Sequence, residues 1–544
     1  MAFIKNTPIA TENCRRVDVQ IGNQGTVTGC ALRSPRSKKE LCHRFCGIPY
    51  SLSVDGENRF KRPRKIPEDF DYTGEYIDFK LKCPQPASDD IRLGYIKSPS
   101  DENITYLNIS VPASDKFKPK DGWPVLIYIH GGWLQNGSPS SDAYNAMELF
   151  DDEETRDKFI LVTPGYRLNI FGFLSCEELL KEDSKGLNVG FWDQRFALEW
   201  VHDNIKYFGG NSEKLTLSGL SAGAYSTFFQ LAYELYHQEE SQLIKQVIFF
   251  SNCLFVQPKT LSETQEQFEE VCAKLAISSD LAPEEKLTAL RKIDAGYLED
   301  IIPELRMHTF RAVTDGEFVP PTLLQDILSG EYAQMLKAKG VRLMCGDVSN
   351  EGLTYSVFNP PTSLPNLIDQ VENYYPKKVV DSLLEVYDVN QISNPAESSP
   401  LELSKLYGKI VADGQVYASL RGFLDKIINN GFPQQDVFRY RVSFRPKYVD
   451  EFLAPNDGVP HGCDTPIWFY SLRDGYNEEE ITITRNWLKP YLSFLNFNDY
   501  IDGWSSADIK KIRWFKQDGS IEYEADPDWD RGVKVANVAY MAQV

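Results

Sequence analysis

A serine among small residues is the first feature of this sequence that could do chemistry. In LTLSGLSAGAYS, residues 215–226, Ser221 occupies a Gly-x-Ser-x-Gly pattern between a strand-like run and a helical one. Small residues leave the backbone room for a tight turn, and in a nucleophile elbow such a turn lifts a serine hydroxyl clear of the main chain. The same pattern also occurs in ordinary strand-to-helix connections, so the motif needs support from the rest of the chain.

A serine hydroxyl becomes a good nucleophile when a nearby base takes its proton, and that base is usually a histidine held by a carboxylate. In hydrolases with an elbow the acid and then the histidine follow the serine along the chain. Of the six histidines, only His237, His308 and His461 lie beyond Ser221. His237 ends a helical pattern and His308 belongs to a charged helical stretch. His461 lies in NDGVPHGCDTP, a loop composition, and is therefore the expected base.

The acid is expected after a strand between the serine and the histidine. The stretch VRLMCGDVSNEG offers Asp347, directly after an apolar run, and Glu351, one loop further on and before Gly352. The chemistry of the two side chains does not separate them, and both remain candidates at this point.

An oxyanion hole needs backbone N–H groups close to the developing negative charge, and therefore small residues at the end of a strand. The segment YIHGGWLQNGS, residues 128–138, supplies small residues directly after a buried strand pattern. The other donor is expected on Ala222, the residue after the serine.

Strand and helix patterns that could position these residues alternate from residue 124 onward. Strands are predicted within 124–130, 159–174, 215–219, 247–252 and 341–347, and helices over 194–208 and 225–237. Such alternation predicts an α/β fold with a mostly parallel central sheet and helices on both faces. Residues 260–335 are helical and charged and are interpreted as an insertion packed over the sheet. With no repeat or linker, residues 1–544 are predicted to form one large domain.

Composition excludes several classes of partner. The net charge of −20 disfavours nucleic acid and anionic membranes. No apolar run has the length of a membrane span, and the first residues contain no apolar run of the length of a signal-peptide core. The ten cysteines are scattered without a zinc-ligand spacing, so free thiols in a reducing, cytoplasmic compartment are expected. No metal or organic cofactor is predicted, and the sequence defines no oligomeric state.

From about residue 20 to residue 500 the sequence resembles the type-B carboxylesterase/lipase family, the cholinesterase-like branch of the α/β-hydrolases. The motifs that carry this resemblance are FCGIPY, ITYLNISVP, HGGW, VTPGYRLNIFGFL and, above all, GLNVGFWDQRFALEWVHDNIKYFGGNSEKLTLSGLSAGA at residues 186–224. The resemblance implies an α/β-hydrolase fold with Ser221 as nucleophile, Glu351 as acid and His461 as base. It places the oxyanion hole at the four residues Gly131, Gly132, Trp133 and Ala222, with Gly131 shaping the turn.

The sequence departs from this family in several places. Leu220 replaces the glutamate that precedes the serine in cholinesterases, and Trp133 replaces a small residue of the glycine turn. Cys83 matches one family cysteine, but its partner position holds Ile104. The segment 84–104, which corresponds to the cap of fungal lipases, is strongly polar.

We therefore expect a serine carboxylesterase that hydrolyses small or medium esters through an acyl-enzyme, with a small-molecule ester as its partner. A lipase or sterol esterase acting on long-chain lipid esters is the alternative. A catalytically silent, cholinesterase-like binding protein is a third reading. Members of that class usually lose a catalytic residue, and none is lost here.

Overall fold

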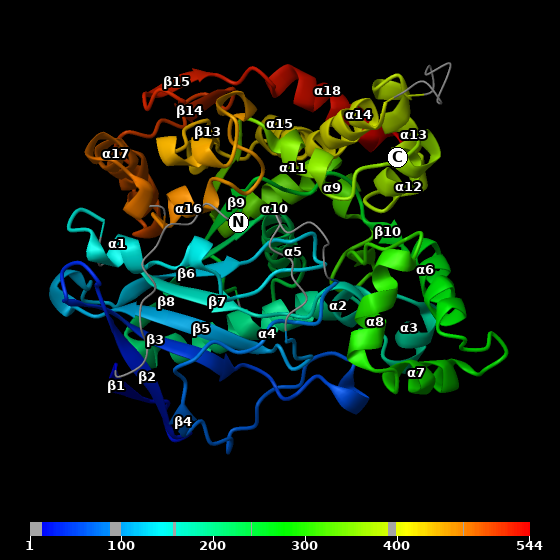
Figure 1. Ribbon diagram of the computed structural model, residues 1–544, viewed down its shortest axis with the longest axis horizontal. Helices are drawn as coiled ribbons and strands as arrows, with labels where there is room; N and C mark the ends of the chain where they lie inside the picture. The colour runs from blue at the N-terminus through cyan, green and yellow to red at the C-terminus, as the bar shows by residue number, and fades with distance from the viewer. Residues whose placement is uncertain (1–13, 87–98, 156–158, 241, 390–398, 472) are drawn as a thin grey trace.

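The computed structural model describes residues 14–86, 99–155, 159–240, 242–389, 399–471 and 473–544 (Figure 1). A sheet of 13 strands runs through this part of the chain. In spatial order its strands are β1 (Arg15–Gln20), β2 (Thr26–Arg33), β3 (Glu40–Pro49), β5 (Tyr106–Pro112), β7 (Ile160–Pro164), β6 (Trp123–Ile129), β8 (Gly210–Leu220), β9 (Gln246–Phe250), β12 (Arg342–Val348), β13 (Val437–Val442), β14 (Lys511–Phe515) and β15 (Ile521–Ala525), with β4 (Gly74–Glu75) paired to β2.

The centre of the sheet is parallel and its two ends are antiparallel. Every neighbouring pair from β7 to β14 is parallel. The pairs from β1 to β7 and the pair β14–β15 are antiparallel, apart from the short β4, which pairs with β2 in parallel. Because parallel strands run the same way, the ends of β6, β8, β9 and β12 lie along one edge. The candidate site residues follow these ends, so this edge is where the chain can bring them together.

Both faces of the central strands are buried. In β6, Val125, Ile127 and Ile129 belong to one apolar cluster, whereas Leu126 and Tyr128 belong to another. Successive strand side chains point to opposite faces, so an unbroken apolar run indicates cover on both sides. One cluster contains residues of α4 and α5, and the other contains residues of α1, α16 and α17, which gather at the left of Figure 1.

The helices are α1 (Met147–Asp151), α2 (Asn169–Phe173), α3 (Glu177–Glu182), α4 (Val189–Asn204), α5 (Ala222–Tyr236), α6 (Leu261–Lys274), α7 (Pro283–Arg291), α8 (Ala295–Ile301), α9 (Leu323–Ser329), α10 (Glu331–Lys339), α11 (Glu351–Val357), α12 (Leu364–Glu372), α13 (Lys377–Val386), α14 (Pro400–Ala412), α15 (Ala418–Asn429), α16 (Thr465–Trp468), α17 (Glu478–Leu495) and α18 (Trp529–Met541). The predicted helix at 194–208 starts earlier, at Val189, and ends in a 3₁₀ turn at Ile205–Phe208. A left-handed Asn188 (φ 52°) sets that earlier start.

The region 260–335 is helical, as expected from its sequence. It contains α6 to α10 and the second strand of a short parallel pair, β10 (Lys259–Thr260) and β11 (Val313–Thr314). Helices α6, α7 and α8 lie together at one side of the molecule (Figure 1). Apolar side chains of this region join the cluster that contains α4 and α5, so it shares a core with the sheet. The division of the chain into domains stays a prediction.

The prediction that all cysteines are free thiols is wrong at two positions. Cys14 and Cys30 form a disulfide, with their Cα atoms 5.8 Å apart. The cause is the register of the first hairpin, which pairs Arg16 with Cys30 and so brings the residue before β1 against β2. The other eight cysteines are free. The cytoplasmic location stays a prediction.

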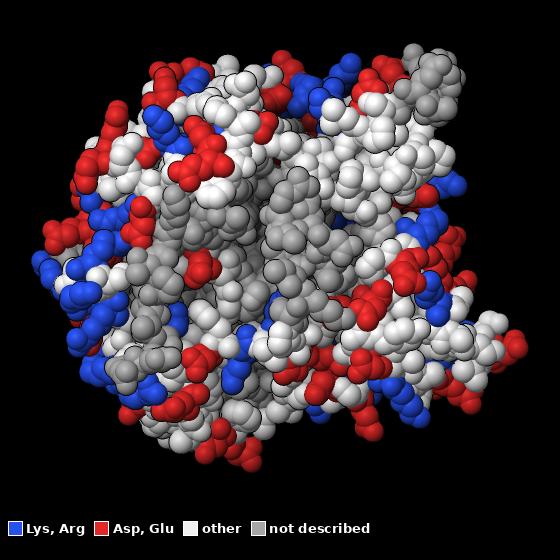
Figure 2. All heavy atoms as spheres, in the orientation of Figure 1, with Lys and Arg blue, Asp and Glu red and all other residues white. Residues whose placement is uncertain are grey.

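The described surface carries charges of both signs. Acidic and basic side chains lie intermixed around the periphery of the face in Figure 2. Within the described ranges, no helix combines the length and the apolar character needed to cross a membrane.

Candidate active site

Ser221 lies on a strained turn between β8 and α5. Its backbone angles are φ 56° and ψ −121°, a combination that residues with a Cβ atom rarely adopt. Its N–H donates to the Phe250 carbonyl at 2.8 Å, which fastens the turn to the end of β9. The side chain is 7% exposed. The strand, turn and helix order is the one that a nucleophile elbow requires.

The glycines of the motif are needed for close approach. A Cβ atom added to Gly223 would lie 2.0 Å from the Ile129 carbonyl oxygen. One added to Gly131 would lie 2.5 Å from the Leu220 carbonyl oxygen and 3.2 Å from the Ser221 Cβ. The glycine turn after β6 is therefore pressed directly against the serine turn after β8, as an oxyanion hole requires.

Three backbone N–H groups at this contact have no internal acceptor. Among the described residues, no hydrogen bond uses the N–H of Gly132, Trp133 or Ala222. Gly132 (φ 113°) and Trp133 (φ 60°) have left-handed backbone angles that turn the chain sharply after β6. Ala222 is the first residue of α5, where an N–H has no partner within the helix. These groups are able to donate to an anionic oxygen beside the serine.

Glu351 and His461 form a buried pair. The Nδ1 atom of His461 lies 2.5 Å from the Oε2 atom of Glu351, and the two residues are 6% and 0% exposed. The other oxygen, Oε1, accepts from the Ser251 hydroxyl at 2.7 Å and from the Val348 N–H at 2.9 Å. A carboxylate oxygen accepts, so Nδ1 donates to Glu351, and in the neutral imidazole Nε2 is then the acceptor.

The segments that carry this pair are fastened to each other. Asn350, directly before Glu351, forms a parallel bridge with Pro460, directly before His461. The Thr354 hydroxyl, on α11, donates to the His461 carbonyl at 3.2 Å. Glu351 is the first residue of α11, whereas His461 lies in the turn before α16.

Asp347, the other acid that the sequence left open, is occupied elsewhere. It lies inside β12 and is not a turn residue. Its oxygens form ion pairs with Arg441 at 2.6 Å and Arg421 at 2.8 Å, and all three side chains are buried. The geometry therefore brings Glu351, and not Asp347, to His461.

Within the described ranges, the Ser221 hydroxyl and the His461 ring do not form a hydrogen bond with each other. The Nε2 atom instead lies 3.2 Å from the hydroxyl of Tyr355, whose ring centroid is 4.9 Å from that of His461. Hydrogen bonds between catalytic groups often form only when substrate is present.

The Trp133 indole forms part of the same wall. Its ring meets the ring of Tyr355, on α11, edge-on at 6.1 Å and lies 4.6 Å from the ring of Phe358, the residue directly after α11. This bulky residue in a turn that is usually small therefore packs against the helix that carries the acid.

Sequence reasoning missed three polar residues of this site. They are Ser251, which donates to Glu351, Tyr355, which faces His461, and Asp464, which is buried close behind the histidine. Tyr355 follows the acid by one helical turn, a spacing that puts both on one face of a helix. That spacing was the available signal for Tyr355, whereas Ser251 and Asp464 depend on tertiary contacts.

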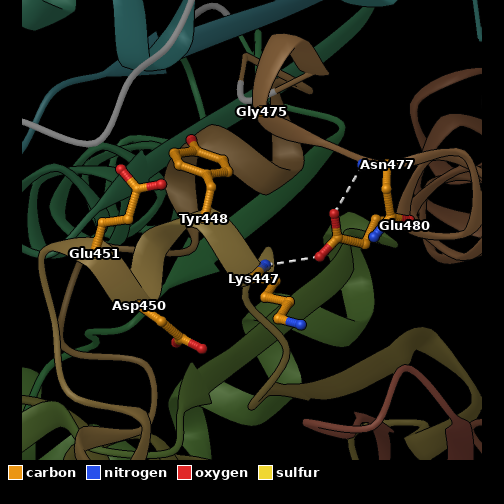
Figure 3. Close-up of a pocket in the computed structure, with 7 residues that line it drawn as sticks. All are labelled: Lys447, Tyr448, Asp450, Glu451, Gly475, Asn477 and Glu480. Atoms are coloured by element: carbon orange, nitrogen blue, oxygen red, sulfur yellow. Dashed lines mark hydrogen bonds between the residues drawn. The ribbon is translucent and has the colours of Figure 1, made fainter.

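A separate hollow lies at the loops around α17 (Figure 3). Its volume is about 510 Å³, and it is lined by Lys447, Tyr448, Asp450, Glu451, Gly475, Asn477 and Glu480. The Glu480 carboxylate already accepts from the N–H groups of Lys447 at 2.7 Å and Asn477 at 2.9 Å. The Glu480 carboxylate thus holds two loop residues at the start of α17, and none of the predicted catalytic residues lines this hollow.

Part of the polar segment 84–104, residues 87–98, lies outside the described residues.

A mostly parallel sheet with helices on both faces and a strained serine turn at a strand end defines an α/β hydrolase. The chain matches the model of the carboxylesterase family over residues 15–514 and belongs to that family, which confirms the predicted fold class. It is a carboxylic ester hydrolase.

Its relatives include an esterase/lipase of Schizosaccharomyces pombe, 43% identical over 91% of this chain and 92% of the relative. A carboxylic ester hydrolase of Gibberella moniliformis is 34% identical over 94% of each chain. An acetylcholinesterase of Trittame loki is 28% identical over 85% of this chain and 83% of the relative.

Proposed function

We propose that the protein is a serine carboxylesterase that hydrolyses small or medium, water-soluble esters through an acyl-enzyme. The observation that carries the proposal is the buried pair of Glu351 and His461, 2.5 Å apart, beside the strained turn of Ser221. A charge-assisted contact of this kind holds the imidazole in one orientation and stabilises its cation.

In the proposed reaction the Ser221 oxygen attacks the ester carbonyl while its proton passes to His461 Nε2. The N–H groups of Gly132, Trp133 and Ala222 donate to the resulting oxyanion. The carbon–oxygen bond to the alcohol then breaks, and Nε2 gives its proton to the leaving alcohol. Water attacks the acyl-serine with His461 as base, which releases the acid and restores the serine.

The experiment is a comparison of initial rates on p-nitrophenyl acetate, butyrate, octanoate and palmitate, with Ser221→Ala beside the wild type. A maximum at short chains that disappears in the variant is the expected result. Full activity in Ser221→Ala would overturn the serine mechanism.

The second candidate is a lipase. A secreted triacylglycerol lipase of Gibberella zeae is 26% identical over 86% of this chain, which favours keeping this alternative. A maximum at palmitate, together with a rise in rate when the substrate exceeds its solubility and forms an emulsion, would replace the esterase proposal with this one.

A further inference from the structure

The Tyr355 hydroxyl lies at the atom through which the proposed reaction moves its proton. It is 3.2 Å from His461 Nε2, and it also interacts with the Ser221 side chain. A group that faces both the base and the nucleophile lies beside the position of the reacting ester. The residue is 1% exposed, so water does not compete freely for its hydroxyl.

The direction of the contact follows from its neighbours. In the neutral imidazole whose Nδ1 donates to Glu351, Nε2 is the acceptor. Burial, reinforced by the nearby charge of Glu351, raises the pKa of Tyr355 well above its usual value, so the phenol keeps its proton. Tyr355 therefore donates to Nε2 in the free enzyme. Two further titratable groups of the same turn, Cys463 and Asp464, lie close to this pair.

Proton transfer changes what Tyr355 can bond. When the serine proton reaches Nε2, that atom turns from an acceptor into a donor, so the Tyr355 O–H can no longer donate to it. An unpaired hydroxyl in a buried site is costly, so it needs another acceptor within reach. In the tetrahedral intermediate a new acceptor is the ester oxygen that is about to leave, since this oxygen must itself approach Nε2 to receive the proton.

The ring is held where this exchange needs it. Tyr355 lies on α11 one turn beyond Glu351, with the Trp133 ring on one side and the His461 ring on another. The hydroxyl can change partners by rotation about its carbon–oxygen bond without movement of the ring.

We propose that Tyr355 is a catalytic residue that donates a hydrogen bond to the leaving-group oxygen of the ester as the alcohol departs. This inference rests on the proposed function. The bond matters most where negative charge on that oxygen is least stable, as in alkyl esters. It matters little for p-nitrophenyl esters, whose leaving group is a stable anion.

The experiment compares ethyl acetate with p-nitrophenyl acetate, which share an acyl group and differ in the leaving group. The measured quantity is kcat/KM, which reports the acylation half of the reaction and is independent of the shared deacylation step. In Tyr355→Phe, which keeps the ring, we expect kcat/KM to fall on the order of 10- to 100-fold for ethyl acetate, the range for a hydrogen bond to a charged group. For p-nitrophenyl acetate we expect a fall of less than about 3-fold, because little charge needs stabilising.

The matched control is Tyr375→Phe, which removes another buried hydroxyl, one that accepts from Gln415 Nε2 at 2.8 Å. It should affect the two substrates equally. An equal fall for both substrates in Tyr355→Phe, or no fall in either, would overturn the inference. If Tyr355→Phe gives either of these results but Ser221→Ala still abolishes activity, the role of Tyr355 is refuted and the proposed serine mechanism is not. The failure of this inference can therefore be distinguished from the failure of the proposed function.

Discussion

Asp464 should make the protein less stable as the pH rises. The residue is 0% exposed, and its Oδ2 atom accepts from the Trp468 indole at 2.9 Å. Its Oδ1 atom has no hydrogen-bond partner among the described residues. Burial raises the pKa of Asp464 from 3.8 to about 7. Each pH unit of this difference corresponds to about 1.4 kcal/mol, so ionisation of the carboxyl costs up to about 4 kcal/mol.

The raised pKa fixes the direction of the effect. The folded protein binds this proton more tightly than the unfolded chain, so the contribution is fully present below about pH 4 and is lost as the pH rises through about 7. Asp464→Asn keeps an oxygen for Trp468 and cannot ionise. Relative to the wild type, its free energy of unfolding should rise by about 2 to 3 kcal/mol between pH 5 and pH 8.

The assay is urea unfolding followed by circular dichroism at pH 5, 6, 7 and 8 on both proteins. Asp526→Asn serves as a control of opposite sign, because Arg421 and Arg439 hold the pKa of Asp526 below its usual range. Removal of this paired carboxylate should destabilise the protein at each of these pH values. A constant difference between Asp464→Asn and the wild type from pH 5 to pH 8 would refute the reasoning.

Three further predictions concern the site and the fold. In Glu351→Gln an amide N–H group or a less basic oxygen faces the Nδ1–H of His461, so kcat should fall by on the order of 10² to 10⁴. A fall below 10-fold would count against the pair. Gly223→Ala places a methyl group 2.0 Å from the Ile129 carbonyl oxygen of β6 and should destabilise the fold by about 2 kcal/mol or more. In thermal unfolding, a melting temperature equal to that of the wild type would contradict the close contact. Alkylation of the denatured, unreduced protein should modify eight cysteines and leave Cys14 and Cys30, and ten modified residues would disprove the disulfide.

The local features of the site were predictable from the sequence. The turn at Ser221 depends on glycines beside it in the chain, and the buried strands are nearly continuous apolar runs, so both have short-range signatures. The choice between Asp347 and Glu351 had no such signature. It depends on Arg421 and Arg441, which reach Asp347 from a helix and a strand far along the chain.

Contacts that depend on register or side-chain direction were not predictable either. The Cys14–Cys30 bridge follows from the pairing of β1 with β2, which composition does not define. The helical spacing of Tyr355 from Glu351 was visible, but the direction of its hydroxyl toward His461 depends on how α11 meets the turn before α16. The resemblance to the carboxylesterase family supplied the choice of Glu351, whose catalytic role stays a prediction, and the structure adds that Glu351 contacts His461.

The most direct test of the central claim is the site at which a covalent organophosphonate attaches. The protein is treated with a fluorophosphonate at neutral pH, and the adduct is measured by intact mass and then mapped by peptide sequencing. One adduct per chain, on Ser221 alone, with none in Ser221→Ala and greatly slowed labelling in His461→Ala, is the predicted result. An unlabelled wild-type protein, or an adduct on another residue, would contradict the assignment of Ser221 as the nucleophile.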